Sequence, residues 1–144
     1  METAVSVLGL FAIAALFGGM VFFPAVVAPT VFRSLPEAEA GTFLRRLFPL
    51  YYAYMIATSL VAAIAFVSRP LIFWALLIVA ASTLAVRQGL VPRLNAWRDA
   101  SLEGDDEAGR AFETGHRVSV VINLAQLVLV SVLLVLLGLK IPSF

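Results

Sequence analysis

The sequence contains no cysteine and little charge. Without cysteine, disulfides, thiolate metal sites and cysteine nucleophiles are excluded. Only 13% of the 144 residues are Asp, Glu, Lys or Arg, and the formal net charge is +1. A soluble domain carries about 25% charged residues. No basic patch with interleaved aromatic residues occurs, so we do not expect a nucleic-acid partner.

Apolar residues dominate, at 62% of the chain, with a mean hydropathy of +1.01. A chain of this length cannot bury so much apolar surface in its own core, so membrane lipid must surround it. Four apolar runs are long enough to cross ~30 Å of hydrocarbon, and they cover about 4–28, 50–67, 71–91 and 118–139. The sequence therefore predicts an all-α integral membrane four-helix bundle, one transmembrane domain over 1–144.

Basic residues are distributed unevenly between the two ends of these spans. Eight lie between spans one and two or between spans three and four: Arg33, Arg45, Arg46, Arg87, Arg93, Arg98, Arg110 and Arg117. The opposite end has only Arg69 and Lys140. Because positive charge is retained in the cytoplasm, we expect both termini on the non-cytoplasmic side. In a bacterium this membrane is the inner membrane.

The two cytoplasmic segments, about 34–48 and 92–117, are predicted to be helical. Ser34-Leu35-Pro36-Glu37 has the pattern of a capping box, and the helix that follows is expected to end before Pro49. Asp105-Asp106-Glu107 places acidic residues where a second helix starts, which favours the helix dipole. That helix is expected to run without a break into the fourth span.

Short segments recur in the two halves of the chain. Val27-Ala28-Pro29 ends the first span, as Leu90-Val91-Pro92 ends the third. Glu39-Ala40-Gly41 precedes the second span, as Glu107-Ala108-Gly109 precedes the fourth. These matches favour two tandem two-helix hairpins related by a pseudo-two-fold axis along the membrane normal.

A polar stripe runs along the start of the fourth span. His116, Ser119, Asn123 and Gln126 are spaced by three, four and three residues, which places them within an arc of roughly 80° on one helix face. Polar side chains at membrane depth face a bundle interior or a cavity rather than lipid. The stripe therefore indicates an inward-facing polar surface.

The second span repeats this spacing in Tyr51, Tyr54 and Thr58. If the hairpins correspond, the two polar faces oppose each other and line a chamber between spans two and four that opens toward the cytoplasm. The alternative is that these groups bond one another and hold helices together, as interhelical polar contacts commonly do. Both interpretations stay open from the sequence.

His116 is the only histidine, and it is the only candidate for ligating a metal or a haem-like ring. The sequence offers no second ligand beside it, because it has no cysteine and no carboxylate deep in a span. A locally hydrogen-bonded histidine at the interface is an equal alternative. No second catalytic group accompanies it either, so an enzyme is the least favoured class.

The first span carries a different pattern. Gly18 and Gly19 allow another backbone to approach closely. Pro24 frees a carbonyl group and is expected to kink the helix, and Pro29 follows near the end of the span. We expect these four residues to form a helix-packing face.

A series of motifs covers nearly the whole chain in a fixed order. They are Gly18-Gly19-Met20-Val21-Phe22-Phe23, Ala28-Pro29-Thr30-Val31-Phe32, Leu47-Phe48-Pro49 with Tyr51-Tyr52, Val91-Pro92-Arg93, and His116-Arg117-Val118-Ser119 followed by Asn123. Together they resemble the transmembrane protein 205-like family, small four-span membrane proteins built on a domain of unknown function. The resemblance implies a four-helix membrane protein and carries no catalytic residues with it.

Two functions follow from these features. The first is a membrane protein that binds or helps to transport a small molecule, lipid or metal in the polar chamber. The second is an accessory or scaffold subunit of a larger membrane complex, or a homo-oligomer, with no chemistry of its own. Membrane lipid is a partner in both cases.

Overall fold

The computed structural model describes residues 2–139 and is helical throughout this range apart from short turns. Two of its elements, η1 and η2, are single π-helical turns inside longer helices. The elements in chain order are α1 (Glu2–Phe22), η1 (Phe23–Val27), α2 (Ala28–Ser34), α3 (Glu37–Ala65), α4 (Pro70–Ala85), η2 (Val86–Leu90), α5 (Val91–Leu102) and α6 (Asp106–Gly138). The predicted all-α four-helix membrane bundle is confirmed.

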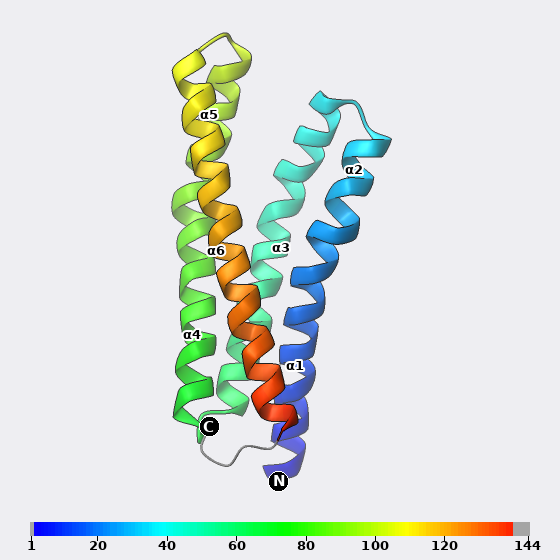
Figure 1. Ribbon diagram of the computed structural model, residues 1–144, viewed down its shortest axis with the longest axis vertical. Coiled ribbons are helices and arrows are strands. Elements are labelled where there is room, and N and C mark those ends of the chain that lie inside the picture. The colour runs from blue at the N-terminus through cyan, green and yellow to red at the C-terminus, as the bar shows by residue number, and fades with distance from the viewer. Residues whose placement is uncertain (1, 140–144) are drawn as a thin grey trace.

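Four helical stretches are long and apolar enough to cross a membrane: Ala4–Ser34, Glu37–Ala65, Pro70–Leu102 and Asp106–Gly138. The start of α1, the α3–α4 turn and the end of α6 lie at one end of the bundle, and the α2–α3 and α5–α6 turns lie at the other, where the two helix pairs diverge (Figure 1). Lys140, one of the two basic residues assigned to the non-cytoplasmic side, lies outside the described residues.

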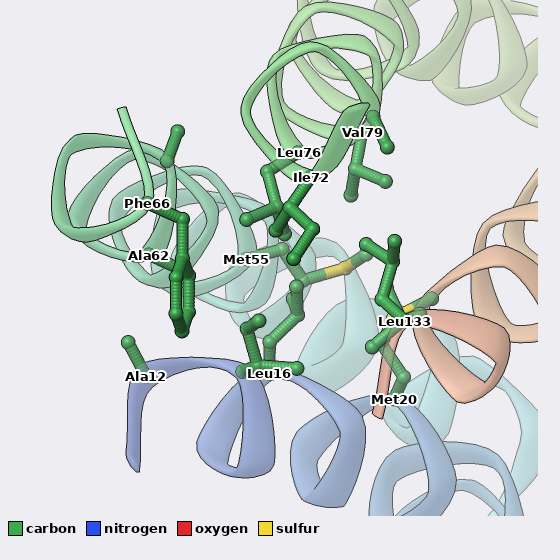
Figure 2. Close-up of a cluster of buried hydrophobic side chains, with 14 of the residues drawn as sticks. Ala12, Leu16, Met20, Met55, Ala62, Phe66, Ile72, Leu76, Val79 and Leu133 are labelled. Carbon is green, nitrogen blue, oxygen red and sulfur yellow. The ribbon is translucent and has the colours of Figure 1, made fainter. Parts of the chain in front are cut away.

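The apolar core occupies the end of the bundle where the helices converge. All four spans contribute fully buried side chains, among them Leu16 from α1, Met55 from α3, Leu76 from α4 and Leu133 from α6. Figure 2 shows these side chains pointing toward one another, with Met20 at the edge of the cluster. The apolar core therefore holds all four spans together at one end, and the two helix pairs diverge at the other (Figure 1).

Two sequence expectations at the diverging end were wrong. The predicted cytoplasmic helix over 34–48 does not end before Pro49. It is the first part of α3, which continues through this proline to Ala65. The missing N–H costs α3 one hydrogen bond, which the long apolar stretch on the C-terminal side of Pro49 offsets by packing. Ser34 does not form a capping box, since it is the last residue of α2, and Pro36 occupies the N-cap of α3 without a side-chain hydrogen bond.

The start of α6 follows the sequence expectation. The Asp105 carboxylate accepts hydrogen bonds from the backbone N–H groups of Glu107 (2.9 Å) and Ala108 (3.0 Å). Two of the N–H groups that have no partner within the helix are thereby satisfied. From this cap α6 runs without a break from Asp106 to Gly138.

The two π-helical turns occupy equivalent places in the two halves. In η1 the N–H of Ala28 bonds the carbonyl of Phe23, and in η2 the N–H of Val91 bonds the carbonyl of Val86, each five residues back. Pro29 or Pro92 comes next and has no N–H to donate. The wider turn keeps each proline ring clear of the preceding carbonyl groups. This shared geometry supports the prediction of two related hairpins.

Candidate functional site

A cavity of about 880 Å³ lies between the two diverging helix pairs, directly beyond the apolar core. Residues from α1, η1, α2, α3, α5 and α6 line it, and Met20 belongs both to its wall and to the core. Ligand sites of proteins commonly have volumes of about 300–1,000 Å³ and combine apolar walls with a few polar groups. The cavity therefore has the size and composition of a small-molecule site.

Four aromatic rings form one wall of the cavity. The rings of Phe23 and Tyr51 stack with centroids 4.3 Å apart, and those of Phe48 and Tyr52 stack at 5.9 Å. Phe23 comes from η1 and the other three from α3, so the π-helical turn presents its ring to the second span. Tyr52 is almost completely buried.

A second wall is the polar face of α6. His116, Ser119 and Asn123 all line the cavity, as the sequence predicts for this stripe. Ser119 donates to the carbonyl of His116 (2.7 Å), and the Asn123 amide donates to the carbonyl of Ser119 (2.9 Å). His116 stacks on Phe112 with ring centroids 6.0 Å apart and stays exposed at the cavity mouth.

One polar atom in this wall has no partner in the part of the chain that the structure describes. The Asn123 Oδ1 atom is buried and accepts no hydrogen bond. Tyr52 lies near this amide without meeting hydrogen-bond geometry. A buried acceptor left without a donor costs roughly 1–3 kcal/mol. Nε of Arg87, in η2, is also buried and unpaired, but Arg87 does not line the cavity.

Ion pairs close the side of the cavity between α3 and α5. Arg45 on α3 bonds both carboxylate oxygens of Asp99 on α5, at 2.6 and 3.2 Å. Arg98 on α5 reaches Glu37 at 3.2 Å, and its guanidinium lies 5.5 Å from the ring centroid of Phe112. Asp99 lies in the predicted cytoplasmic segment that follows the third span, and the hydrogen bond to Arg45 lowers the pKa of its carboxyl. We call this set of contacts the α3–α5 seam.

The opposite side, between α2 and α6, has no such contacts. In residues 2–139 no hydrogen bond or ion pair joins these two helices. The cavity walls at this side are apolar and exposed, and they include Phe32 on α2 and Val120 and Leu124 on α6. We call this opening the α2–α6 gap. Figure 1 shows the α2–α3 turn and the α5–α6 turn apart at this end of the bundle.

Three predicted site residues lie away from the cavity. The Tyr54 hydroxyl donates to the carbonyl of Ala15 on α1 (2.6 Å), and Thr58 donates to the carbonyls of Tyr54 and Met55 in its own helix. Gln126 is buried and donates to Ser82 (2.7 Å) and Thr83 (3.1 Å) on α4. These three groups join helices or satisfy their own backbone, which is the alternative that the sequence left open.

Of the four predicted packing residues of the first span, Gly19 packs directly against another helix. A Cβ atom at Gly19 would lie 2.6 Å from the Tyr54 ring, so this glycine permits close packing of α1 on α3. A Cβ atom at Gly18 would meet nothing within 4 Å. Pro24 is part of η1 and lines the cavity, and Pro29 follows η1, so both shape the π-helical turn.

In the described residues, no neighbouring side chains support metal ligation by His116. No three His, Cys, Asp or Glu side chains gather there as a metal site would require. His116 faces the cavity mouth beside an aromatic ring, and no carboxylate pairs with it in residues 2–139. A metal or haem-like group would have to take its remaining ligands from elsewhere.

Sequence reasoning missed the ionic part of the site and one of its tyrosines. The sequence did not predict the ion pairs of Arg45 and Arg98, because their carboxylate partners lie 54 and 61 residues away. Tyr52 was overlooked because it lies outside the stripe of Tyr51, Tyr54 and Thr58. Two signals pointed to it: its direct neighbour Tyr51 is a predicted site residue, and the motif Leu47-Phe48-Pro49 with Tyr51-Tyr52 contains it.

Residues 11–102 match a family described as a domain of unknown function, DUF4149. The match covers more than half of the chain, which therefore belongs to this family. It includes α3 and the ionic residues of α5, whereas the polar face of α6 lies beyond it. No curated protein and no solved structure matches the chain.

Proposed function

We propose that this chain is a membrane protein that binds a small molecule in the cavity between its two helix pairs. The observation that carries the proposal is the buried Asn123 Oδ1 atom, which lacks a donor in a wall of an ~880 Å³ cavity. A bound molecule that donates a hydrogen bond after a small turn of this amide would satisfy it. The aromatic wall supplies flat apolar contact area.

The predicted orientation of the chain indicates which side of the membrane the cavity mouth faces. If both termini face away from the cytoplasm, the cavity mouth at His116 faces the cytoplasm, and Asn123 lies ~10 Å deeper along α6. This placement suits a protein that holds a ligand at the cytoplasmic leaflet or hands it on to a partner. The resemblance to the transmembrane protein 205-like family agrees with such a small four-span protein.

Native mass spectrometry of the gently extracted full-length protein tests the proposal. We expect the wild type to retain a small molecule, and Asn123→Leu and His116→Ala to lose it while keeping the wild-type expression level and oligomer size. Ser131→Ala is the matched control, because Ser131 lies on the same helix, bonds only the carbonyl of Leu127 and does not line the cavity. Equal occupancy in Asn123→Leu and the wild type would contradict the proposal.

One surface favours the second function, a scaffold or a homo-oligomer. Phe11, Gly18 and Phe22 recur at seven and four residues on α1, and all three are exposed. Ala14, also exposed, lies four residues before Gly18, which gives the small-xxx-small spacing of transmembrane helix contacts. This face is free to pack against another transmembrane helix.

Oligomer size separates the two functions. If scaffolding is the function, Gly18→Leu breaks the assembly seen by native mass spectrometry, and the cavity variants leave it unchanged. Because a Cβ atom at position 18 would meet nothing within 4 Å in the described residues, we expect Gly18→Leu to keep the fold of the chain. If Gly18→Leu changes neither assembly nor fold, this face has no role as an interface.

A further inference from the structure

We infer that the cavity takes an uncharged amphiphile with a hydroxyl head group, which enters from the bilayer through the α2–α6 gap. This inference rests on the proposed binding function and adds the chemical class of the ligand and its route. Three features support it. The charged side chains around the cavity are paired, the α2–α6 gap is apolar, and the polar groups in the inner part of the cavity are uncharged.

Charge around the cavity is already balanced. Two arginines and two carboxylates line it, and they pair with each other as Arg45 with Asp99 and Arg98 with Glu37. All four belong to the α3–α5 seam. Among the described residues of the seam, a charged head group would therefore find no arginine or carboxylate without a partner. Deeper in the cavity, it would lose its hydration without compensation.

The side chains that line the cavity at the α2–α6 gap are apolar and exposed. Val120 is 50% exposed and Leu124 is 58% exposed, and both line the cavity from α6. Phe32, 58% exposed, lines it from α2. A hydrocarbon chain can lie across these side chains without removing any polar group from its partner. We therefore expect the ligand to enter from the lipid phase at this side.

The polar groups at depth are hydroxyl and amide groups. Tyr51, Tyr52 and Asn123 line the inner part of the cavity, and none of them carries a charge at neutral pH. A ligand hydroxyl both donates and accepts, so it suits the Asn123 carbonyl oxygen and the tyrosine hydroxyls together. The volume of about 880 Å³ lies within the usual range for one drug-sized molecule.

Three probes with the same chain and different heads test the ligand class. The full-length protein in phosphatidylcholine nanodiscs is offered oleyl alcohol, oleyl sulfate or oleyltrimethylammonium at equal concentration. Native mass spectrometry then measures the bound fraction. We expect the alcohol to bind about tenfold or more tightly than either charged probe. Tighter binding of the sulfate or of the ammonium probe would overturn the inference.

Paired tryptophan substitutions test the route. Val120→Trp places a large ring in the gap, and Val121→Trp places the same ring on the neighbouring lipid-facing position, which is 60% exposed and does not line the cavity. We expect about tenfold weaker binding of oleyl alcohol in Val120→Trp and no change in Val121→Trp. Leu124→Trp with Val128→Trp is a second pair, should the first fail to fold.

The outcomes separate this inference from the proposed function. Suppose that the wild type retains a small molecule that Asn123→Leu loses. If a charged probe then binds best, only the ligand class is wrong. If the gap variants bind as the wild type does, only the route is wrong. If no molecule is retained and none of the three probes binds in an Asn123-dependent way, the binding function itself is wrong.

Discussion

The two sides of the cavity differ, although the two-hairpin prediction makes them counterparts. In that prediction α2 corresponds to α5 and α3 to α6, so the α3–α5 seam corresponds to the α2–α6 gap. The seam is tied by a bidentate arginine–carboxylate pair and a second ion pair. The gap presents exposed Phe32, Val120 and Leu124. The two sides thus differ in their contacts: ion pairs join one, and the other is apolar and exposed in the described residues.

The largest expected effect comes from pushing α5 away from α6. A Cβ atom at Gly115 would lie 2.9 Å from both Leu94 and Trp97, which belong to α5. Gly115→Leu should therefore destabilise the protein by about 1–3 kcal/mol through overpacking and displace Arg98 from the seam. Thermal unfolding in detergent measures the loss.

Gly138→Leu is the matched control for this variant, since it places the same side chain on the same helix where a Cβ atom would meet none of the described residues within 4 Å. If Gly115→Leu and Gly138→Leu unfold at the same temperature, the close approach of α5 to α6 is not what supports the seam.

A smaller effect is expected from breaking the ion pairs alone. Asp99→Arg places like charges beside Arg45 and should open the seam but not the gap. Because the chain has no cysteine, the single substitutions Asn95→Cys for the seam and Leu124→Cys for the gap give a clean comparison. We expect labelling by a water-soluble maleimide to rise only about two- to fivefold at the seam, because solvent-exposed ion pairs are weak.

The charge exchange Arg45→Asp with Asp99→Arg should return seam labelling toward the wild-type rate, because the pair forms again with its sign reversed. Failure of the double variant to do so, or equal opening at the gap, would mean that the ion pair does not hold this side closed.

The smallest effect is a dependence on pH. Arg45 lowers the pKa of Asp99, so the stabilisation by this pair is fully present above the ordinary carboxyl value of about 3.9. It is lost only as pH falls through the lower value of the folded state. A fluorophore attached to the thiol of the Asn95→Cys variant should therefore keep constant acrylamide quenching from pH 7 to 5 and become more quenched below about pH 4.

The same measurement in a His116→Gln background excludes a contribution from the one histidine of the chain. A rise in quenching between pH 7 and 5 in that background would show that the Asp99 pair is not what closes the seam. A fluorophore on the Leu124→Cys variant reports the gap and should change little over the whole range.

The sequence was sufficient for the fold because lipid imposes strong constraints on composition and length. Four apolar runs and the acidic start of α6 predict the bundle and its longest helix, since every backbone group in lipid must be bonded within a helix. Pro49 was misjudged because local rules treat proline as a helix end, whereas packing along α3 carries the helix through it. Local propensity yielded to tertiary contacts there.

The candidate site was predictable only in part. The period of α6 places Ser119 and Asn123 on one inward face, and the structure puts both in the cavity wall. The same period in α3 misleads, since Tyr54 turns to the Ala15 carbonyl on α1. Helical spacing fixes which side chains share a face, but it does not say which neighbour that face meets. The pairing of Arg45 with Asp99 depends on that neighbour and has no local signal.

The π-helical turns have a consequence for the phase of the helices. Each turn holds one residue more than regular α-helical winding allows, which rotates everything downstream by about 100°. In α5 this offset decides that Arg98 and Asp99 meet α3. Removing a single residue from Val86–Leu90 would rotate α5 about its axis and move Arg98 and Asp99 to another face of the helix. The composition of the chain would be almost unchanged. The extra residue of the π-helical turn thus determines which face of the following helix meets its neighbours.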